Sequence, residues 1–309
     1  MKYNINAISK KLLEAVADFT GTFKGAFHIW ENGKCAGTRS TEHVHIEAKG
    51  DQPGINVIVE PGTKGETVYI PACITNSGLD DKVYNDFYVG KDADVVIVAG
   101  CGVHSDDHSQ TRHSGVHRFV IDENAHVRYE EKHIGIGVSD GERVIDPVAD
   151  IELNKNAYLE MNTTQISGIQ HTKRKTTAKV AEGAKLVVRE RLFTEGDQKA
   201  ESTFYVSLDG EGSGADIVSR SVAKDHSYQY YESTILGNAP CTGHSECDSI
   251  IDDEAIVDAS PRLFARNKNA ALIHEAAIGK IAGDQILKFR TLGLTEEEAE
   301  AKIIEGFLS

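Results

Sequence analysis

The sequence predicts a mainly β protein: a right-handed parallel β-helix (β-solenoid) core with an N-terminal helix and a C-terminal helical hairpin. Three observations support this fold class. A degenerate β-prone repeat occupies the middle of the chain, a helical period of apolar residues precedes it, and a second helical pattern follows it. We expect an N-terminal helical segment over residues 1–24, the β-helix over 25–272 and a C-terminal helical segment over 273–309.

The N-terminal helix is predicted from residues 4–19, where apolar side chains recur with a helical period. These side chains are Ile5, Ile8, Leu12, Leu13, Val16 and Phe19. Thr20 and Gly21 end the pattern. The chain is therefore expected to begin with one amphipathic helix.

The repeat consists of a polar turn, an alanine and an alternating run of β-prone residues. Clear copies centre on Ala93, Ala125, Ala157 and Ala184, and weaker copies on Ala215 and Ala255. The first four alanines are 32, 32 and 27 residues apart, whereas a propeller blade needs about 40 residues and four strands. A stacked solenoid fits better, because only a small side chain suits the tight corner of a coil. A β-sandwich with coincidental alanines is the alternative.

Two further helices are predicted between residues 275 and 308. The first ends at Gly293, a usual helix stop, and the second begins after Thr295, which forms a capping box with Glu298. Acidic residues in that first turn face the positive end of the helix dipole. The hairpin is too small to have its own core, so we expect it to pack on the β body or on another protein.

The composition narrows the function classes. The chain has 309 residues and a formal net charge of -15, which disfavours nucleic-acid binding, because that needs clustered Lys and Arg. The sequence has no run of about 18 apolar residues and an amphipathic beginning, so neither a membrane span nor a secretory signal is expected. A cytoplasmic protein is predicted. Its five separated cysteines then favour free thiols or metal ligands over disulfides.

Residues 100–117 combine one cysteine with two aspartates and four histidines. The histidines are His104, His108, His113 and His117. Neutral imidazole and thiolate groups are ligands for zinc or iron, so this stretch is a candidate metal site. Its spacing matches no zinc-finger template, and a solvated loop whose histidines bond to backbone and water is the simpler explanation.

A second constellation lies near the end of the repeat, with a thiol at Cys247 and an imidazole and a carboxylate at His274 and Glu275. Adjacent side chains diverge on both strands and helices, so His274 and Glu275 can face one ligand only if the backbone bends there. We expect that bend where the β-helix gives way to helix. A buried cysteine and a surface His–Glu pair are the alternatives. The sequence lacks the glycine loops that cradle nucleotide phosphates, so ATP binding is not expected.

The last forty residues or so resemble the SufB/SufD family of iron–sulfur cluster assembly scaffolds. The shared features are HEA at 274–276, DQ at 284–285, the RxxGL turn at 290–294 and GF at 306–307. Weaker similarity reaches back to about residue 90. The resemblance implies a β-helix core with helical ends, dimerisation through the β-helices, and an ABC-type ATPase, SufC, bound at the C-terminal helices.

The same resemblance implies roles for individual residues. Cys247 matches the cluster-building cysteine of SufB, and His274 and Glu275 match its junction, although the interval from cysteine to glutamate is one residue shorter here. Cys101 matches the cysteine that receives sulfur, and His133 lies on the proposed sulfur path where SufB has a glutamine. The interface with the ATPase would include Asp284, Gln285, Phe289 and Arg290.

The implied function is that of a homodimeric scaffold, not an enzyme, which builds a labile iron–sulfur cluster at the dimer interface and gives it away. Mixed sulfur, oxygen and nitrogen ligation suits such a transient cluster, which would be lost on aerobic purification. The expected partners are a SufC-type ATPase, a sulfur donor, and a second copy or a SufB/SufD paralogue. A SufD-like structural partner that ligates no cluster is the alternative, and a β-helix polysaccharide enzyme is a weaker third reading.

Overall fold

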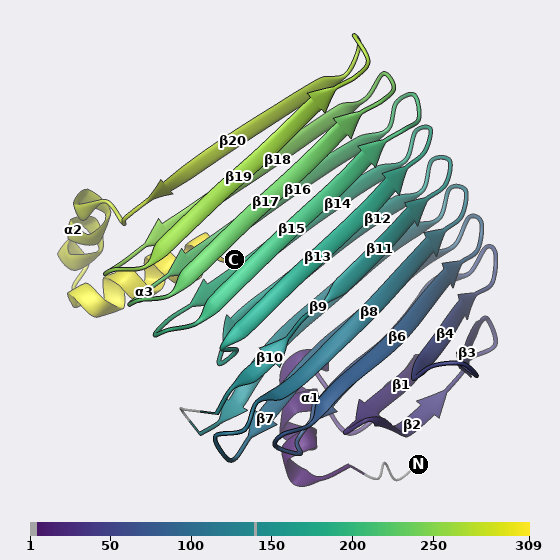
Figure 1. Cartoon of the computed structure of the whole chain (residues 1–309), viewed down its shortest axis with the longest axis horizontal. Helices are drawn as coiled ribbons and strands as arrows, with labels where there is room; N and C mark the ends of the chain where they lie inside the picture. Colours follow the sequence, from purple (N-terminus) through teal and green to yellow (C-terminus); the bar gives the residue numbers. More distant parts are fainter. Residues whose placement is uncertain (1–4, 139–140) are drawn as a thin grey trace.

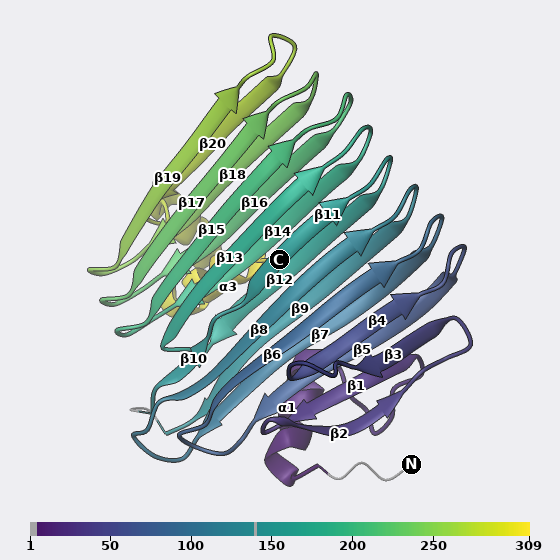
Figure 2. The ribbon, with the colours of Figure 1, turned by 45° about the vertical axis from the view of Figure 1, so that its right-hand side comes forward.

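The computed structural model of the protein describes residues 5–138 and 141–309. Over these residues the chain winds into a flattened solenoid of two sheets that face each other (Figures 1 and 2). The mainly β fold class is confirmed, and no helix interrupts the described part of the solenoid. The right-handed sense of the coil stays a prediction.

Both sheets are built from strands that lie one coil apart. The first sheet has the spatial order β2 (Lys34–Arg39), β1 (Ala26–Glu31), β5 (Lys64–Ile74), β7 (Asp94–Ser105), β9 (His126–Gly137), β12 (Tyr158–Ser167), β14 (Lys185–Thr194), β16 (Gly214–Ala223), β18 (Thr242–Ile251), β20 (Ala271–Gly279). The second has the order β19 (Ile256–Ala265), β17 (Tyr228–Gly237), β15 (Lys199–Leu208), β13 (His171–Val180), β10 (Arg143–Ile145), β8 (Thr111–Ile121), β6 (Asp80–Val89), β4 (Gly54–Val59), β3 (Val44–Ala48), with β11 (Val148–Leu153) also between β13 and β8. Pairing is parallel from coil to coil, whereas β1–β2 and β3–β4 are antiparallel.

Side chains alternate between the interior and the outer surface along each strand, as the two-residue period of a strand requires. In β18, for example, Ser245 and Cys247 are buried inside, while His244 and Glu246 face outward. Because successive coils pair in register, equivalent positions lie side by side. A shift of one residue therefore moves a side chain to the opposite face of the sheet.

The repeating alanines form one corner of the solenoid, as predicted. Ala93, Ala125, Ala157 and Ala184 are all buried. The residues after Ala125, Ala157 and Ala184 donate their N–H groups to the carbonyl of the alanine one coil earlier, at 2.8 to 2.9 Å. This close stacking favours a small side chain, which explains why the repeat keeps a small residue there.

The prediction that Ala215 and Ala255 continue the alanine corner is wrong. Ala215 lies inside β16, opposite Leu186, and Ala255 precedes β19 in the second sheet. The alanine corner continues instead through Ser213 and Cys241, since Thr242 donates its N–H to the Ser213 carbonyl. Ser213 and Cys241 are also small. A search for recurring alanines does not find them, because they share only their small size with the alanines.

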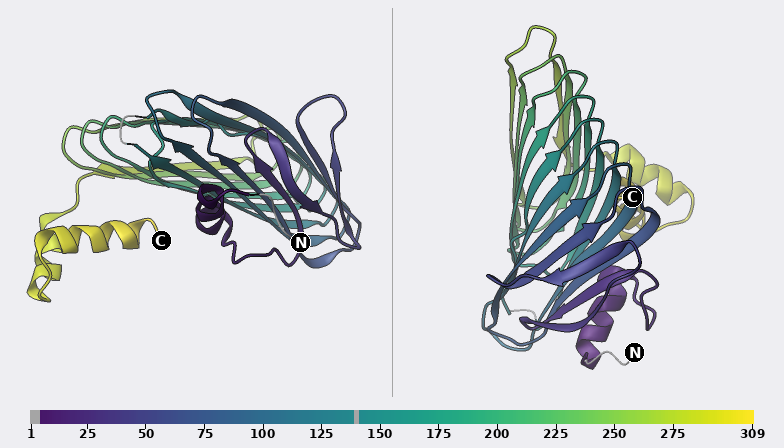
Figure 3. Two further views of the ribbon diagram at one scale, coloured as in Figure 1. Left: turned by 90° about the horizontal axis from the view of Figure 1, so that it is seen from below. Right: turned by 90° about the vertical axis from the view of Figure 1, so that its right-hand side faces the viewer.

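The N-terminal helix α1 (Ala7–Ala17) is confirmed, and the side chain of Asn6 caps it by accepting from the Ser9 N–H. The helix lies on the outer face of the first sheet, over β5, β7 and β9. Two glycines of β7 allow this close approach: a Cβ at Gly100 would lie 2.6 Å from Val16 Cβ. Figure 3 shows α1 against the N-terminal coils and the C-terminal helices on the same side, further along.

The C-terminal helices are α2 (Gly283–Thr291) and α3 (Glu296–Phe307), and the predicted capping box of Thr295 and Glu298 is present. The predicted start of the helical segment at residue 273 is wrong, because β20 continues to Gly279. The expected bend at His274–Glu275 is wrong for the same reason: pairing with β18 keeps both residues in an extended strand. Within the described residues, no helix is long and apolar enough to cross a membrane.

Candidate functional site

A column of polar side chains crosses the interior of the solenoid. The register places Glu131, Thr163, Glu190, Ser219 and Cys247 side by side on β9, β12, β14, β16 and β18. All five are buried. Their alternation with outward residues resembles that of any strand, so the sequence pattern does not distinguish this polar column from an ordinary apolar core.

One arginine from the opposite sheet joins two carboxylates of this column. Arg174 of β13 lies 2.7 Å from Glu131 Oε2 and 3.5 Å from Glu190 Oε1. Burial disfavours the charged form of Glu131, but attraction to Arg174 outweighs it and holds the pKa of that carboxyl well below its usual value. The interior therefore contains a buried triad in which one guanidinium contacts two carboxyl groups.

Hydroxyl groups extend the polar contacts toward Cys247. Ser202 and Ser219 donate to the two oxygens of Glu190, at 2.6 and 2.7 Å, and Ser219 is the neighbour of Cys247 in the next strand. Burial raises the pKa of the Cys247 thiol to about 11. The thiol is thus protonated at neutral pH, and a metal ion that binds there must displace the proton.

The other end of the column meets Cys101 and His133, which the sequence comparison paired on a sulfur path. They are direct neighbours on β7 and β9, both facing the interior. His133 Nε2 lies 3.5 Å from Glu131 Oε1. Burial raises the pKa of the Cys101 thiol well above its usual value. A continuous series of buried polar groups therefore leads from Cys101 to Cys247.

Cys247, His274 and Glu275 do not share one face of the sheet. Cys247 and His274 lie on the inner face, where His274 Nδ1 is 3.0 Å from the Ser245 carbonyl oxygen. Glu275 pairs with Glu246 and points outward. The residue opposite Cys247 is Ala276, so the interval that is one residue short puts Glu275 on the far side of the sheet from the thiol.

Glu275 belongs instead to an outer cluster that sequence reasoning missed. One ligand atom each from His244, Glu246 and Glu275 lies within 4.8 Å of the others. His244 Nδ1 also lies 2.7 Å from Asp216 Oδ1. Imidazole and carboxylates are suitable ligands for divalent iron. The sequence could have indicated this cluster only if two facts were combined. His244 and Glu246 are two residues apart and so share a face of their strand, and Glu275 follows Glu246 by one coil.

The four histidines of the predicted metal stretch are divided by the fold. His113 and His117 face the interior on β8, while His104 on the outer face of β7 lies 3.0 Å from Asp106. His108 lies in the connection between β7 and β8. Over the described residues, none of the four belongs to a group of three preformed metal ligands. They therefore do not form one site.

The residues expected at the ATPase interface lie on α2, which has no buried residue. These are Asp284, Gln285, Phe289 and Arg290. Apolar side chains nearby are also open to solvent, with Leu287 59% and Leu292 73% exposed. Exposed apolar groups of this kind are typical of a surface that binds another protein.

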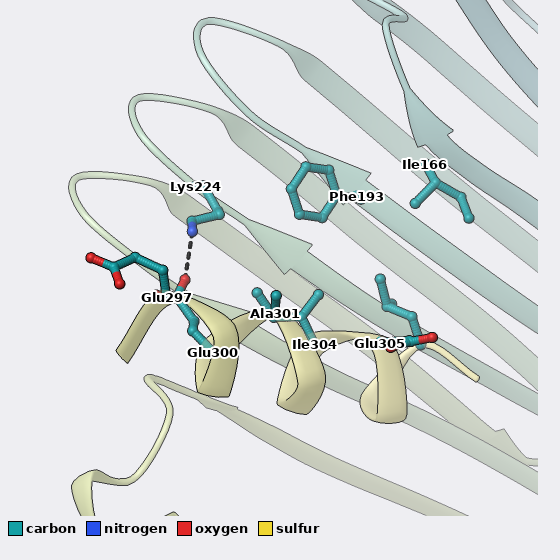
Figure 4. Close-up of a pocket in the computed structure, with 9 residues that line it drawn as sticks. Ile166, Phe193, Lys224, Glu297, Glu300, Ala301, Ile304 and Glu305 are labelled. Atoms are coloured by element: carbon teal, nitrogen blue, oxygen red, sulfur yellow. Dashed lines mark hydrogen bonds and ion pairs between the residues drawn. The ribbon is translucent and has the colours of Figure 1, made fainter. Parts of the chain in front are cut away.

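Helix α3 is attached loosely to the solenoid. It lies over a pocket of about 570 Å³ whose apolar walls include Phe193 of the first sheet and Ile304 of the helix (Figure 4). Lys224 Nζ is 2.5 Å from Glu300 Oε1, and Ala299 is the one residue of α3 that is buried. A helix with so little buried surface opens from the body of the protein at a low free-energy cost.

These features define a β-solenoid protein with buried thiols inside and potential iron ligands outside. Residues 84–307 match the family model described as SUF system FeS cluster assembly, SufBD core domain. The chain belongs to that family. The resemblance read from the sequence is therefore confirmed.

Curated relatives agree with this assignment. An iron-sulfur cluster assembly SufBD family protein of Methanothermobacter thermautotrophicus (strain Delta H) is 29% identical over 85% of this chain and 64% of its own length. A family member of Pyrococcus horikoshii is 28% identical over 91% of this chain and 86% of its own length, and one of Methanocaldococcus jannaschii is 24% identical over 92% and 90%. The chain thus spans less than two thirds of the Methanothermobacter relative but most of the other two.

Proposed function

We propose that the chain is the scaffold of an iron–sulfur assembly complex, which builds a labile cluster at a dimer interface and works with a SufC-type ABC ATPase. The observation that carries this proposal is the buried polar connection between Cys101 and Cys247. Sulfur received at Cys101 would travel past His133, Glu131, Arg174 and Glu190 to Cys247. Burial of this path inside the solenoid would protect reactive sulfur from bulk water and oxidants on the way.

Iron would arrive from the opposite side of the sheet. His244, Glu246 and Glu275 offer nitrogen and oxygen ligands on the outer face, whereas Cys247 and His274 face inward. A cluster held by Cys247 with His274 would form on the inner face, beside the edge strand β20. Glu275 lies on the outer face and would join the cluster only if β20 shifted its register. Mixed ligands of this kind keep the cluster labile and suit transfer.

The same last coil supplies the dimer contact. In the part of the chain that the structure describes, β20 pairs with β18 alone and β19 with β17 alone, so each has a free edge. Long unpaired edges are templates for pairing with another chain. Pairing with a second copy would cover both edges and place two sets of cluster ligands near one interface. A homodimer is the state we propose, and a SufB/SufD paralogue would fit the same edges.

The ATPase would bind at α2 and α3. The solvent-exposed α2 presents apolar and charged groups, and the loosely docked α3 can move with a bound partner. ATP-driven movement of the partner would then open or close the dimer interface beside β20, to which α2 is directly connected.

Anaerobic reconstitution with iron and sulfide tests the cluster assignment. Cys247→Ala should lose most bound iron and sulfide, measured chemically and by Mössbauer spectroscopy. Cys241→Ala is the matched control, because Cys241 is an equally buried thiol at the alanine corner, away from the polar column. Equal iron and sulfide in wild type and Cys247→Ala would show that the ligand assignment is wrong.

The alternative is a SufD-like partner that binds the ATPase and a SufB without ligating a cluster. The presence of both Cys101 and Cys247 favours the SufB-like role. Co-purification with and without a SufB separates the two roles, since an obligate heterodimer would support the alternative.

A further inference from the structure

A small cavity lies inside the first coils, beside Cys101. Its volume is about 10 Å³, and its polar lining consists of His28, Asn85, Cys101, His113 and His117. A cavity of roughly 10–15 Å³ has room for about one water-sized atom. We call this cavity the Cys101 chamber.

Two side chains that line the chamber carry buried polar atoms without a hydrogen-bond partner among the residues that the structure describes. His28 and Asn85 are each 7% exposed, and His28 Nε2 and Asn85 Oδ1 have no hydrogen-bond partner in the described residues. Leaving a buried polar atom unpaired costs about 1–3 kcal/mol. Two such atoms beside one cavity therefore point to a ligand that pairs with them.

His28 offers a hydrogen-bond donor to this ligand. Burial lowers the pKa of His28 to about 4, so its ring is neutral at physiological pH. Its Nδ1 lies 3.8 Å from Sγ of the exposed Cys35. When the Cys35 thiol donates to Nδ1, the ring proton is on Nε2, and an N–H faces the chamber.

His113 is held in place as a proton acceptor. Its Nδ1 is 2.7 Å from Asp81 Oδ2, and the same oxygen accepts from Trp30 Nε1 at 3.0 Å. A carboxylate that fixes one ring nitrogen of a histidine leaves the other nitrogen free to exchange a proton with a reactant. In His113 that other nitrogen is Nε2, on a ring that lines the chamber together with Cys101.

A metal ion fits the chamber less well than a single sulfur atom. Three potential metal-ligand atoms come together in the described residues at His244, Glu246 and Glu275, not around Cys101.

We propose that the Cys101 chamber holds one sulfane sulfur atom, as the terminal atom of a Cys101 persulfide, and that His113 accepts the thiol proton when this persulfide forms. The inference rests on the proposed role of Cys101 in sulfur transfer. The Cys101 thiolate attacks the terminal sulfur of a donor persulfide. One S–S bond forms at Cys101 and the donor S–S bond breaks. The departing donor thiolate takes the proton from His113, so no oxidant or reductant is consumed.

A nearby proton acceptor is needed because burial raises the pKa of the Cys101 thiol well above its ordinary value. The thiolate, not the thiol, is the nucleophile. Both ring nitrogens of His117 have other partners. Its Nδ1 lies 2.8 Å from Tyr129 Oη, and its Nε2 lies 3.4 Å from Asn85 Nδ2. His117 is therefore engaged elsewhere and His28 presents a donor, so His113 is the acceptor among the histidines that line the chamber. His133, the neighbour of Cys101 on β9, is not part of the lining.

The test uses disodium disulfide, a small inorganic persulfide donor, on the full anaerobic protein. After rapid alkylation and digestion, mass spectrometry measures the gain of one sulfur on the peptide that contains Cys101. We expect His113→Gln to slow this gain by about 100-fold, the lower end of general-base effects. His104→Gln is the matched control, because His104 is also buried and paired with an aspartate but lies on the outer face. It should react at the wild-type rate.

Unfolding cannot imitate the expected result. A variant that loses its fold exposes Cys101 and reacts faster, whereas loss of the proton acceptor makes the reaction slower. Asp81→Asn should also slow the gain of sulfur, by a smaller factor. Wild-type rates in His113→Gln, or sulfur gained at Cys35 alone, would overturn the proposal. The cluster function is judged separately: iron retained in Cys247→Ala contradicts that function and leaves the chamber result intact.

Discussion

Replacing Arg174 by methionine would remove the one positive charge that the structure places between two buried carboxylates. The side chains of Glu131 and Glu190 are 4% and 5% exposed, and Arg174 contacts both. Each carboxylate keeps hydroxyl donors: Tyr129 for Glu131, and two serines for Glu190. Glu131 keeps only the His133 ring, 3.5 Å away, as a neighbour that can carry positive charge, and neither carboxylate keeps the guanidinium. Methionine has a similar length, so the change removes charge with little loss of volume.

The expected destabilisation is about 3–5 kcal/mol, the range for a buried ion pair that loses one partner. Lys173→Met is the matched control on the same strand. Lys173 Nζ lies 3.0 Å from Glu201 with side chains 69% and 40% exposed, and such surface pairs contribute about 0–1 kcal/mol. The two variants thus compare the loss of a buried cation–carboxylate pair with the loss of an exposed one.

Urea unfolding followed by circular dichroism measures both changes. Adding Glu131→Gln to Arg174→Met should recover part of the lost stability, since it removes one of the two uncompensated charges. An Arg174→Met variant no less stable than Lys173→Met would refute the view that Arg174 compensates buried charge in this triad. When the measurement is repeated at high salt, the loss of unfolding free energy in Arg174→Met should stay the same, because salt screens buried ion pairs little.

Two further predictions concern pH and the docking of α1. The pKa of Glu131 is lowered in the folded protein, so its contribution to stability is complete above the unfolded value of about 4.3 and is lost as pH falls through the folded value. Urea melts between neutral and acidic pH should therefore show a steeper acid loss in wild type than in Glu131→Gln, and parallel curves would contradict this. Gly100→Ala would place a Cβ 2.7 Å from the Val16 carbonyl oxygen, at a cost of about 1–3 kcal/mol, and limited proteolysis should cleave α1 faster than in Gly50→Ala, where a Cβ meets nothing within 4 Å.

Much of the fold was readable from local sequence because its causes are local. The alanine spacing predicted the coils, since each coil needs a small residue at the corner, and Ala93 to Ala184 occupy that corner. The capping box at Thr295 predicted the start of α3, because its hydrogen bonds lie within one turn. The boundary of the last strand was not readable, since pairing with β18 rather than local propensity keeps His274 and Glu275 extended.

The sequence by itself determined the family, the solenoid and the candidate thiols at Cys101 and Cys247. Only the tertiary structure decided which side chains meet. The polar column, the outer cluster around Glu275 and the Cys101 chamber all join residues that are one or more coils apart in sequence. Coil lengths vary, and a difference of one residue moves a side chain from the interior to the surface. The register of the coils, which no local pattern contains, therefore sets the chemistry of the site.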